Sequence, residues 1–211
     1  MAERPAFNID HGKVITKIYS FEWFPGFSLS QKQKSIESLH NAILSADAHS
    51  RPLEISTKSP ASIGTKLSAF RLTLNSHTLE NIFQSAKVFE NGGPYLDLLE
   101  VPPKEAKRDQ RLQNSGNLTA FRYQGQDFPL VPKTVFYDFI YIAAVRESLN
   151  TEEIQAISTY NTFTDIEFNP AKSINTQART AALIHLILAE YGCLRDFSKD
   201  EFIQYHKEHV I

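Results

Sequence analysis

The residues best suited to chemistry lie in the segment 79–95, LENIFQSAKVFENGGPY. If this segment is an α-helix, its apolar residues share one face, and Glu80, Gln84 and Lys87 fall in a strip of roughly 60° beside that face. An acid, an amide and an amine placed where a core meets solvent could form the wall of a pocket. An interhelical hydrogen-bond network would use the same spacing, and the spacing alone does not separate the two interpretations.

A second chemical candidate is Asp165, within YNTFTDIEFNPAKSINTQAR (160–179). The carboxyl stands between Phe163 and Phe168 in the sequence, so its surroundings could be partly desolvated. Desolvation raises the pKa of a carboxyl and suits it to acid or base catalysis. An Asx-type turn is an equally good interpretation of an aspartate at this position.

Composition narrows the classes of function. The chain has 211 residues, of which 42% are hydrophobic and 11% aromatic, enough for one domain with a sizeable core. A net charge of −2 argues against sequence-independent binding of nucleic acid through a broad basic face. It leaves room for a protein that acts on one modified nucleotide held in a local pocket.

Several familiar sites and targeting segments are missing from the sequence. Cys193 is the single cysteine, which rules out an internal disulfide and a cysteine-based metal cluster. The dinucleotide, P-loop, zinc-protease and serine-hydrolase motifs do not occur. The N-terminus lacks the apolar run of a signal peptide, and no segment is apolar enough to span a bilayer. We therefore expect a soluble cytoplasmic protein without a metal, a cofactor or a membrane partner.

The pattern of helix and strand signals predicts a mainly α (α+β) fold with a few short strands in one compact domain. Residues 1–29 are expected to form an extended, aromatic-rich arm on the surface. Capping signals at Ser30, Thr78 and Ser198 predict helix starts. The remaining expected elements are strands at 53–57, 70–74 and 117–125, a helical turn from 59 to 64, and helices at 30–44, 79–89, 103–112, 132–149, from 151, 175–190 and from 199.

The residues Asn91-Gly-Gly-Pro94 follow the expected helix 79–89 directly. Glycine tolerates left-handed backbone geometry and proline does not continue a helix, so the simpler interpretation is a C-terminal cap. A loop that approaches a phosphate group closely is the alternative.

Five blocks in order resemble the NADAR domains: LSAFRLTL (67–74), LENIFQSAKVF (79–89), EAKR (105–108), YDFIYIAAV (137–145) and TDIEFN…INTQARTAAL (164–183). The resemblance covers residues 53–190 and is strongest to the branch of DarT-associated NADAR antitoxins, which the arm FEWFPGFSLSQKQKSIESLH also resembles. It implies an arm and helix over residues 1–52, a NADAR-like catalytic domain over 53–190 and a C-terminal helical extension over 191–211.

The chain departs from the wider family at several positions. The family's S-N-F is Ser68-Ala69-Phe70 here, and its D-W is Asp138-Phe139. Its D-x-x-W-G has become Asp165-Ile-Glu-Phe168-Asn169, and the glycine of its N-x-x-G is Ala178. The acidic and aromatic positions remain, while tryptophan and glycine are replaced. These replacements are expected to affect substrate preference more than the catalytic residues.

The resemblance implies an ADP-ribosyl glycohydrolase that removes ADP-ribose from guanine bases in nucleic acid, DNA or RNA, and so reverses the modification made by a DarT-type toxin. Its catalytic residues would be Lys87, Glu80 and Asp165. The substrate-binding residues that it implies are Ser68, Phe70, Gln84, Tyr95, Lys107, Arg108, Asp138, Phe163, Phe168 and Asn175.

Other mechanisms and functions remain open from the sequence. Lys87 could attack the anomeric carbon of a ring-opened ribose as a neutral amine, or it could act as an electrostatic clamp. The rival enzyme is an N-glycosidase for a small ribosylamino-pyrimidine, which the wider YbiA-like group suggests. The rival of another class is a protein that neutralises a toxin by binding it, without turnover.

Overall fold

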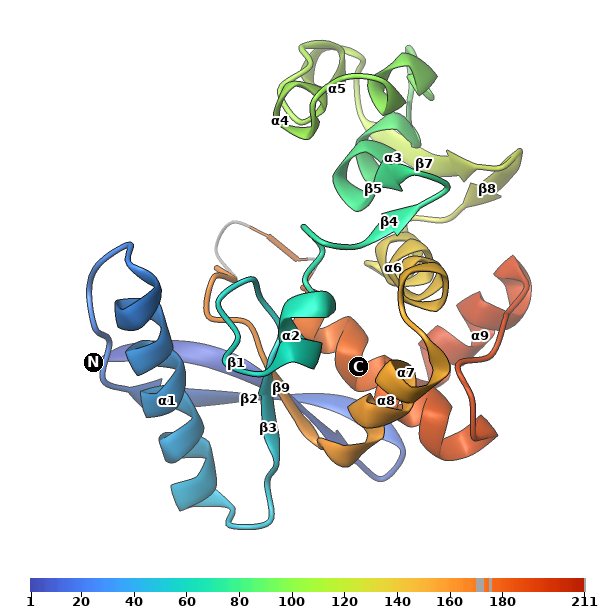
Figure 1. Ribbon diagram of the computed structural model, residues 1–211. Coiled ribbons are helices and arrows are strands. Elements are labelled where there is room, and N and C mark those ends of the chain that lie inside the picture. Colours follow the sequence, from blue (N-terminus) through green and yellow to red (C-terminus); the bar gives the residue numbers. More distant parts are fainter. Residues whose placement is uncertain (170–172, 175, 211) are drawn as a thin grey trace.

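A four-stranded sheet forms the base of the molecule, and Figure 1 shows it in the computed structural model, which describes residues 1–169, 173–174 and 176–210. Its strand order is β2-β1-β9-β3. The four strands are β1 (Ala2–Asp10), β2 (Lys13–Phe21), β3 (Pro52–Glu54) and β9 (Thr162–Thr164). Strand β1 is antiparallel to β2 and β9, while β3 runs parallel to β9.

The N-terminal segment is extended, as expected, but it does not lie on the surface as an arm. Residues 2–21 form a hairpin, and β1 is an inner strand of the sheet. Successive side chains of a strand point to opposite faces. Ala6 is buried against helix α1 (Leu29–Ala46), whereas Phe7 is buried in the larger core on the other face.

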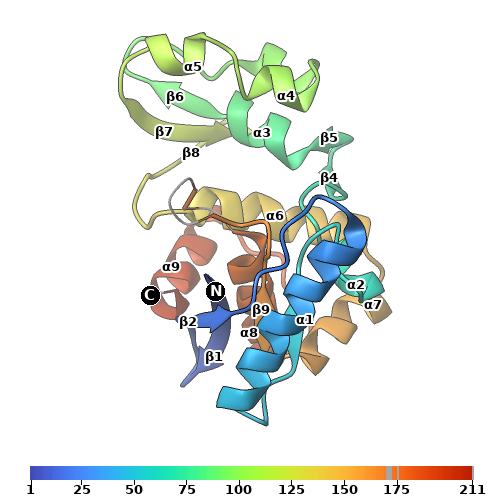
Figure 2. The same ribbon diagram turned by 90° about the vertical axis from the view of Figure 1, so that its left-hand side faces the viewer.

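Helices cover both faces of the sheet (Figures 1 and 2). Helix α1 packs Ile36, Leu39 and Ile43 on one face. Its N-cap is Ser28, which accepts a hydrogen bond from the Gln31 backbone N–H, and not Ser30 as the sequence predicted. The larger core holds the apolar residues of α6 (Val135–Ser148) and α8 (Gln177–Tyr191).

The upper part of the molecule in Figures 1 and 2 is built from the middle of the chain, and α6 lies between it and the part that carries the sheet. Aromatic side chains join it to α6: the ring centroid of Phe136 is 4.7 Å from that of Phe121 and 6.2 Å from that of Phe83. The elements are β4 (Thr73–Leu74), β5 (His77–Thr78), α3 (Leu79–Ser85), β6 (Lys87–Phe89), 3-10 helix η1 (Leu96–Leu99), α4 (Pro103–Ala106), α5 (Arg111–Asn114), β7 (Leu118–Tyr123) and β8 (Gln126–Phe128).

The helix expected over residues 79–89 is shorter than predicted. It begins at the predicted cap Thr78 and ends at Ser85, and Lys87–Phe89 then pairs with β7. Gly-Gly-Pro therefore follows a strand, and the interpretation as a helix cap is wrong. A Cβ on Gly93 would lie 2.2 Å from the Lys87 carbonyl oxygen, so the glycine allows this loop to pack against the backbone of Lys87.

The remaining elements complete the lower part: α2 (Ser62–Lys66), α7 (Thr151–Ala156), 3-10 helix η2 (Ile157–Thr159) and α9 (Lys199–His209). The predicted capping box of Ser198 and Glu201 opens α9, and Gly192 ends α8 with a φ of +72°. The α+β class is confirmed. Among the described helices, none has the length and hydropathy of a membrane span.

Candidate active site

Lys87, Gln84 and Glu80 form a hydrogen-bonded string along one wall of the upper part. The Lys87 Nζ donates to Gln84 Oε1 at 2.6 Å, and Gln84 Nε2 donates to Glu80 Oε1 at 2.7 Å. Gln84 is only 5% exposed, while the Glu80 side chain is 35% exposed. The sequence correctly predicted that these three side chains meet, although Lys87 belongs to β6 and not to the helix.

The environment of Lys87 favours its neutral form more than solvent does. Burial lowers the pKa of Lys87, the charge of Glu80 opposes that shift, and Lys107 adds to it. The Lys87 ammonium also lies 5.2 Å from the centroid of the Phe83 ring, a distance typical of a cation–π contact. Lys107, predicted to bind substrate, is an exposed side chain whose Nζ lies 3.8 Å from Glu80 Oε2.

The short helix α3, which carries Glu80 and Gln84, is fixed at its first turn. At its start the Thr78 hydroxyl accepts from the Asn81 N–H at 3.2 Å. Asn81 is buried, and its Nδ2 donates to the carbonyls of Leu98 at 2.6 Å and Val101 at 2.8 Å. An amide with two backbone partners ties the helix to the loop that leads into α4.

Asp165 lies in a buried turn directly after β9 and is 6% exposed. Its Oδ1 accepts from the backbone N–H groups of Glu167 at 3.0 Å and Phe168 at 3.1 Å. Its Oδ2 accepts from Gln177 Nε2 at 3.0 Å, and Gln177 Oε1 in turn accepts from the Ala69 N–H at 2.7 Å. The two interpretations of Asp165 are therefore compatible, because the residue is both turn-forming and desolvated.

Two acids share the interior near this turn. Burial, and then the charge of Glu54, raises the pKa of Asp165 to about 8. Glu54 itself is 1% exposed. A carboxyl with a pKa near 8 keeps its proton at neutral pH and is suited to donate it.

Tyr137 on α6 was not predicted from the sequence. Its pKa is raised by burial and further by the charges of Asp138, Asp165 and Glu80, acids from both parts of the molecule. Its ring meets Phe83 edge-on at 5.8 Å. The sequence signal was present in YDFIY, but a tyrosine in an apolar helix is typical of a core residue.

Asp138, predicted to bind substrate, has protein partners at both of its carboxylate oxygens. It is fully buried and accepts hydrogen bonds from Thr134 Oγ1 at 2.9 Å, Arg179 Nη2 at 3.3 Å and the Thr180 hydroxyl. His206 Nε2 of α9 lies 2.8 Å from the same carboxylate. Asp138 thus ties α6, α8 and α9 together and fixes Arg179, a cation that sequence analysis missed.

Four of the predicted binding residues are aromatic, which suits them to stack on a base, and they differ in their access to a ligand. Phe70 is 87% exposed and Phe168 is half-buried. Tyr95 bonds the Ser115 hydroxyl, and the Arg111 guanidinium covers its ring at 4.5 Å. Phe163 is 0% exposed in the core, so the prediction that it stacks on a base is wrong. Phe70 and Phe168 remain available.

The other predicted binding residues are placed as follows. Ser68 is fully buried, and its hydroxyl has no hydrogen-bond partner among the described residues. Arg108 is exposed on the segment that follows α4. Asn175 lies outside the described residues.

A polar hollow of about 500 Å³ lies apart from these residues, between α2, α6 and α7. It is lined by Ser62, Thr65, Lys66, Arg71, Ser148, Leu149 and Glu153. None of the predicted site residues lines it, and Lys66 is bonded to Glu153 across it. Over the described residues, no group of three or more histidines, cysteines or acids could hold a metal ion.

Comparison with protein-family models matches the chain to NADAR-DarT1, described as DarT1-associated NADAR antitoxin. The match covers residues 2–211 and so includes the N-terminal hairpin and α9 as well as the segment 53–190. No curated protein matches the chain.

Proposed function

The chain belongs to the family of DarT1-associated NADAR antitoxins, and we propose that it hydrolyses the bond between ADP-ribose and guanine bases in nucleic acid. In this function it reverses the modification made by a DarT-type toxin in the cytoplasm. The single observation that carries the proposal is the string Glu80–Gln84–Lys87, in which a half-buried amine and a carboxylate are held on one wall by an amide.

The chemistry of the bond calls for groups of these kinds. Cleavage between a sugar carbon and a nitrogen develops positive charge at the anomeric carbon, which a nearby carboxylate such as Glu80 stabilises. The departing guanine nitrogen needs a proton. Asp165 is the group with a proton to give at neutral pH, because burial and Glu54 raise its pKa to about 8.

Lys87 offers two routes to the same products. In the covalent route the ribose ring opens to an imine between the sugar carbon and the guanine nitrogen, and the neutral amine of Lys87 adds to that carbon. The guanine nitrogen takes a proton and departs with the electron pair of its bond to carbon, and water then hydrolyses the lysine imine. In the other route the ammonium remains charged and only holds the substrate. The lowered pKa of Lys87 favours the covalent route.

Substrate contacts follow from the exposed candidates. Phe70 and Phe168 have ring surface available to stack on a base. Lys107, with its Nζ 3.8 Å from Glu80, and its neighbour in sequence Arg108 are exposed cations and suit the pyrophosphate. With a net charge of −2, such local contacts account for binding better than a long basic track does.

A substrate panel tests the proposal. The protein is incubated with single-stranded oligonucleotides that carry ADP-ribose on guanine or on thymine, and with a small ribosylamino-pyrimidine. We expect release of ADP-ribose from guanine only. Cleavage of the small compound alone would assign a pyrimidine N-glycosidase, and a stable complex with the toxin without any release would assign a binding protein.

A further inference from the structure

Glu54, at the end of β3, forms hydrogen bonds to the turn that contains Asp165. Its Oε2 accepts from the Thr164 hydroxyl at 2.7 Å, and its Oε1 accepts from the Ile166 N–H at 2.8 Å. These two partners are the residues on either side of Asp165. With the Glu54 side chain 1% exposed, both hydrogen bonds are shielded from water.

The strand register explains why the two carboxyls are neighbours. Glu54 pairs with Thr164 in the parallel ladder, and the Ile55 N–H donates to the Thr164 carbonyl at 2.8 Å. The Thr164 hydroxyl points to the α1 face, where it lies 3.0 Å from His40 Nε2. Asp165 instead bonds Gln177 at the start of α8. Glu54 and Asp165 thus approach the same short stretch of backbone from two sides.

The charged groups that pack around this pair form their contacts with other partners than the Glu54 and Asp165 carboxyls. His40 of α1 stays neutral near pH 7, because burial lowers its pKa to about 4. Lys32 of α1 pairs with Glu167 at 3.0 Å, and Arg179 of α8 pairs with Asp138. Arg4 of β1 donates to the Ile166 carbonyl at 3.4 Å.

The other titratable groups near the pair, among the residues that the structure describes, are acids and tyrosines. Glu167 adds negative charge, and Tyr137 and Tyr141 of α6 remain protonated because burial raises their pKa. Among the described residues, neither Glu54 nor Asp165 is within ion-pair distance of a cation. Two buried acids without a counter-ion do not both ionise easily, and they titrate as a pair.

We propose, on the basis of the function proposed above, that Glu54 is a positioning residue for Asp165. It fixes the turn that presents Asp165 and, through its negative charge nearby, keeps a proton on the Asp165 carboxyl at neutral pH. The hydrogen bonds favour this division of roles. The two oxygens of Glu54 accept from the groups that flank Asp165, and Asp165 Oδ2 faces the Gln177 amide at the start of α8.

The variant Glu54→Gln tests the proposal through the pH dependence of the reaction. Glutamine keeps the shape and removes the charge. Asp165 must be protonated to donate, so kcat/KM falls as pH rises through its pKa. Without the charge of Glu54 that pKa falls, and we expect the alkaline limb of the profile to move to lower pH by at least about one unit. Glu37→Gln, on the exposed side of α1, is the matched control and should leave the limb in place.

A purely structural role would reduce the rate of Glu54→Gln without moving the limb, and that result would overturn the proposal. Carbon-13 NMR of the carboxyl groups gives a readout that needs no activity, with Asp165→Asn used for assignment. In the unaltered protein we expect Asp165 to titrate near pH 8, and in Glu54→Gln at lower pH. Titration of Asp165 near pH 4 in the unaltered protein would overturn the proposal even if the variant does not fold.

The two proposals can fail separately. If the NMR titration shows a raised pKa for Asp165 that falls in Glu54→Gln, and no ADP-ribose is released from guanine, then the proposed function is wrong. The role of Glu54 is retained in that case. If ADP-ribose is released and Asp165 titrates near pH 4, the function is retained and the role of Glu54 is wrong.

Discussion

Around Lys87 an amine and a carboxylate are joined by a neutral amide in a string that opens to solvent, whereas around Asp165 two acids are enclosed. Glu80 at the open end of the string is 35% exposed, and Asp165 is 6% exposed. At Lys87 burial and the neighbouring anion act on the pKa in opposite directions, while at Asp165 burial and the neighbouring acid act in the same direction. The difference lowers the pKa of an amine in one region and raises the pKa of a carboxyl in the other, and the proposed cleavage uses both groups.

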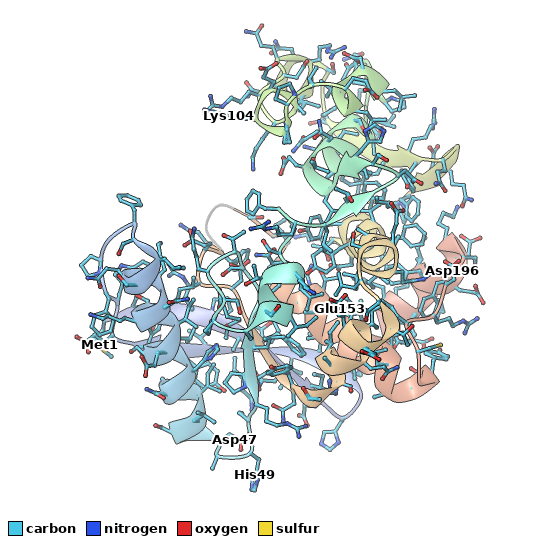
Figure 3. All side chains as sticks on the ribbon, in the orientation of Figure 1. Met1, Asp47, His49, Lys104, Glu153 and Asp196 are labelled. Atoms are coloured by element: carbon cyan, nitrogen blue, oxygen red, sulfur yellow. The ribbon has the colours of Figure 1, made fainter. Side chains whose placement is uncertain are left out.

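Removal of Lys87 should have the largest effect. We expect Lys87→Ala to reduce ADP-ribose release to the uncatalysed background while the protein stays folded, because the side chain borders the core and does not fill it. Lys104→Ala, an exposed lysine on α4 (Figure 3), is the matched control and should keep full activity. Near-normal turnover by a folded Lys87→Ala variant would leave the string as a structural network only.

The substitution Lys87→Arg separates the two routes. A guanidinium stays charged at any accessible pH and does not attack carbon. We therefore expect Lys87→Arg to be as inactive as Lys87→Ala in the release assay. Substantial activity of the arginine variant would show that the lysine acts as a charge clamp.

Asp165→Asn should have the next largest effect, a loss of about 10²-fold in kcat, the usual scale for one acid–base group. The amide accepts the two backbone hydrogen bonds of the turn but does not supply a proton. Single-turnover kinetics with thermal unfolding in parallel would check it. A change confined to KM, with kcat intact, would move Asp165 from proton transfer to binding.

Glu80→Gln should cost about tenfold to a hundredfold in rate and should also change the pH profile. Glu80 raises the pKa of Lys87, so its removal lowers that pKa. If the neutral amine is the reactive form, activity rises with pH through the Lys87 pKa, and the acid limb moves to lower pH in the variant. An unmoved acid limb in a variant of unchanged thermal stability would contradict a reactive neutral amine.

The smallest expected effects concern the nucleic acid around the modified base. A base in a duplex is less accessible, so single-stranded substrate should be cleaved faster than double-stranded substrate by a few-fold. The dependence on salt should be shallow, because few phosphates beyond the pyrophosphate meet a cation. Cleavage at two salt concentrations on matched oligonucleotides measures both effects, and a steep salt slope would contradict a local pocket.

The sequence predicted those elements whose signals are local. Thr78 and Ser198 lie at helix starts where capping rules apply, and both were found there, while the cap predicted at Ser30 lies two residues earlier, at Ser28. Pairing with distant segments was not predictable in the same way. Strand β1 gains its place from β9, more than 150 residues later, and Lys87 leaves its helix because β6 pairs with β7.

Glu54 shows the same limit within the candidate site. In LEIST the alternation places Glu54 opposite the buried Leu53 and Ile55, which suggests a solvent-facing side chain. The sheet is covered on both faces, and α1 encloses that side. The burial of Glu54, and with it the pKa of its carboxyl, depends on the helix that covers this face of the sheet. The spacing of residues along the strand does not contain that information.

The most direct test of the central claim is the number of ADP-ribose molecules released per molecule of protein from guanine-modified single-stranded oligonucleotide, with the toxin absent. Mass spectrometry follows both free ADP-ribose and the restored guanine. We predict equal amounts of the two products and many turnovers per protein molecule. Oligonucleotide that stays modified in the presence of folded protein would contradict the account.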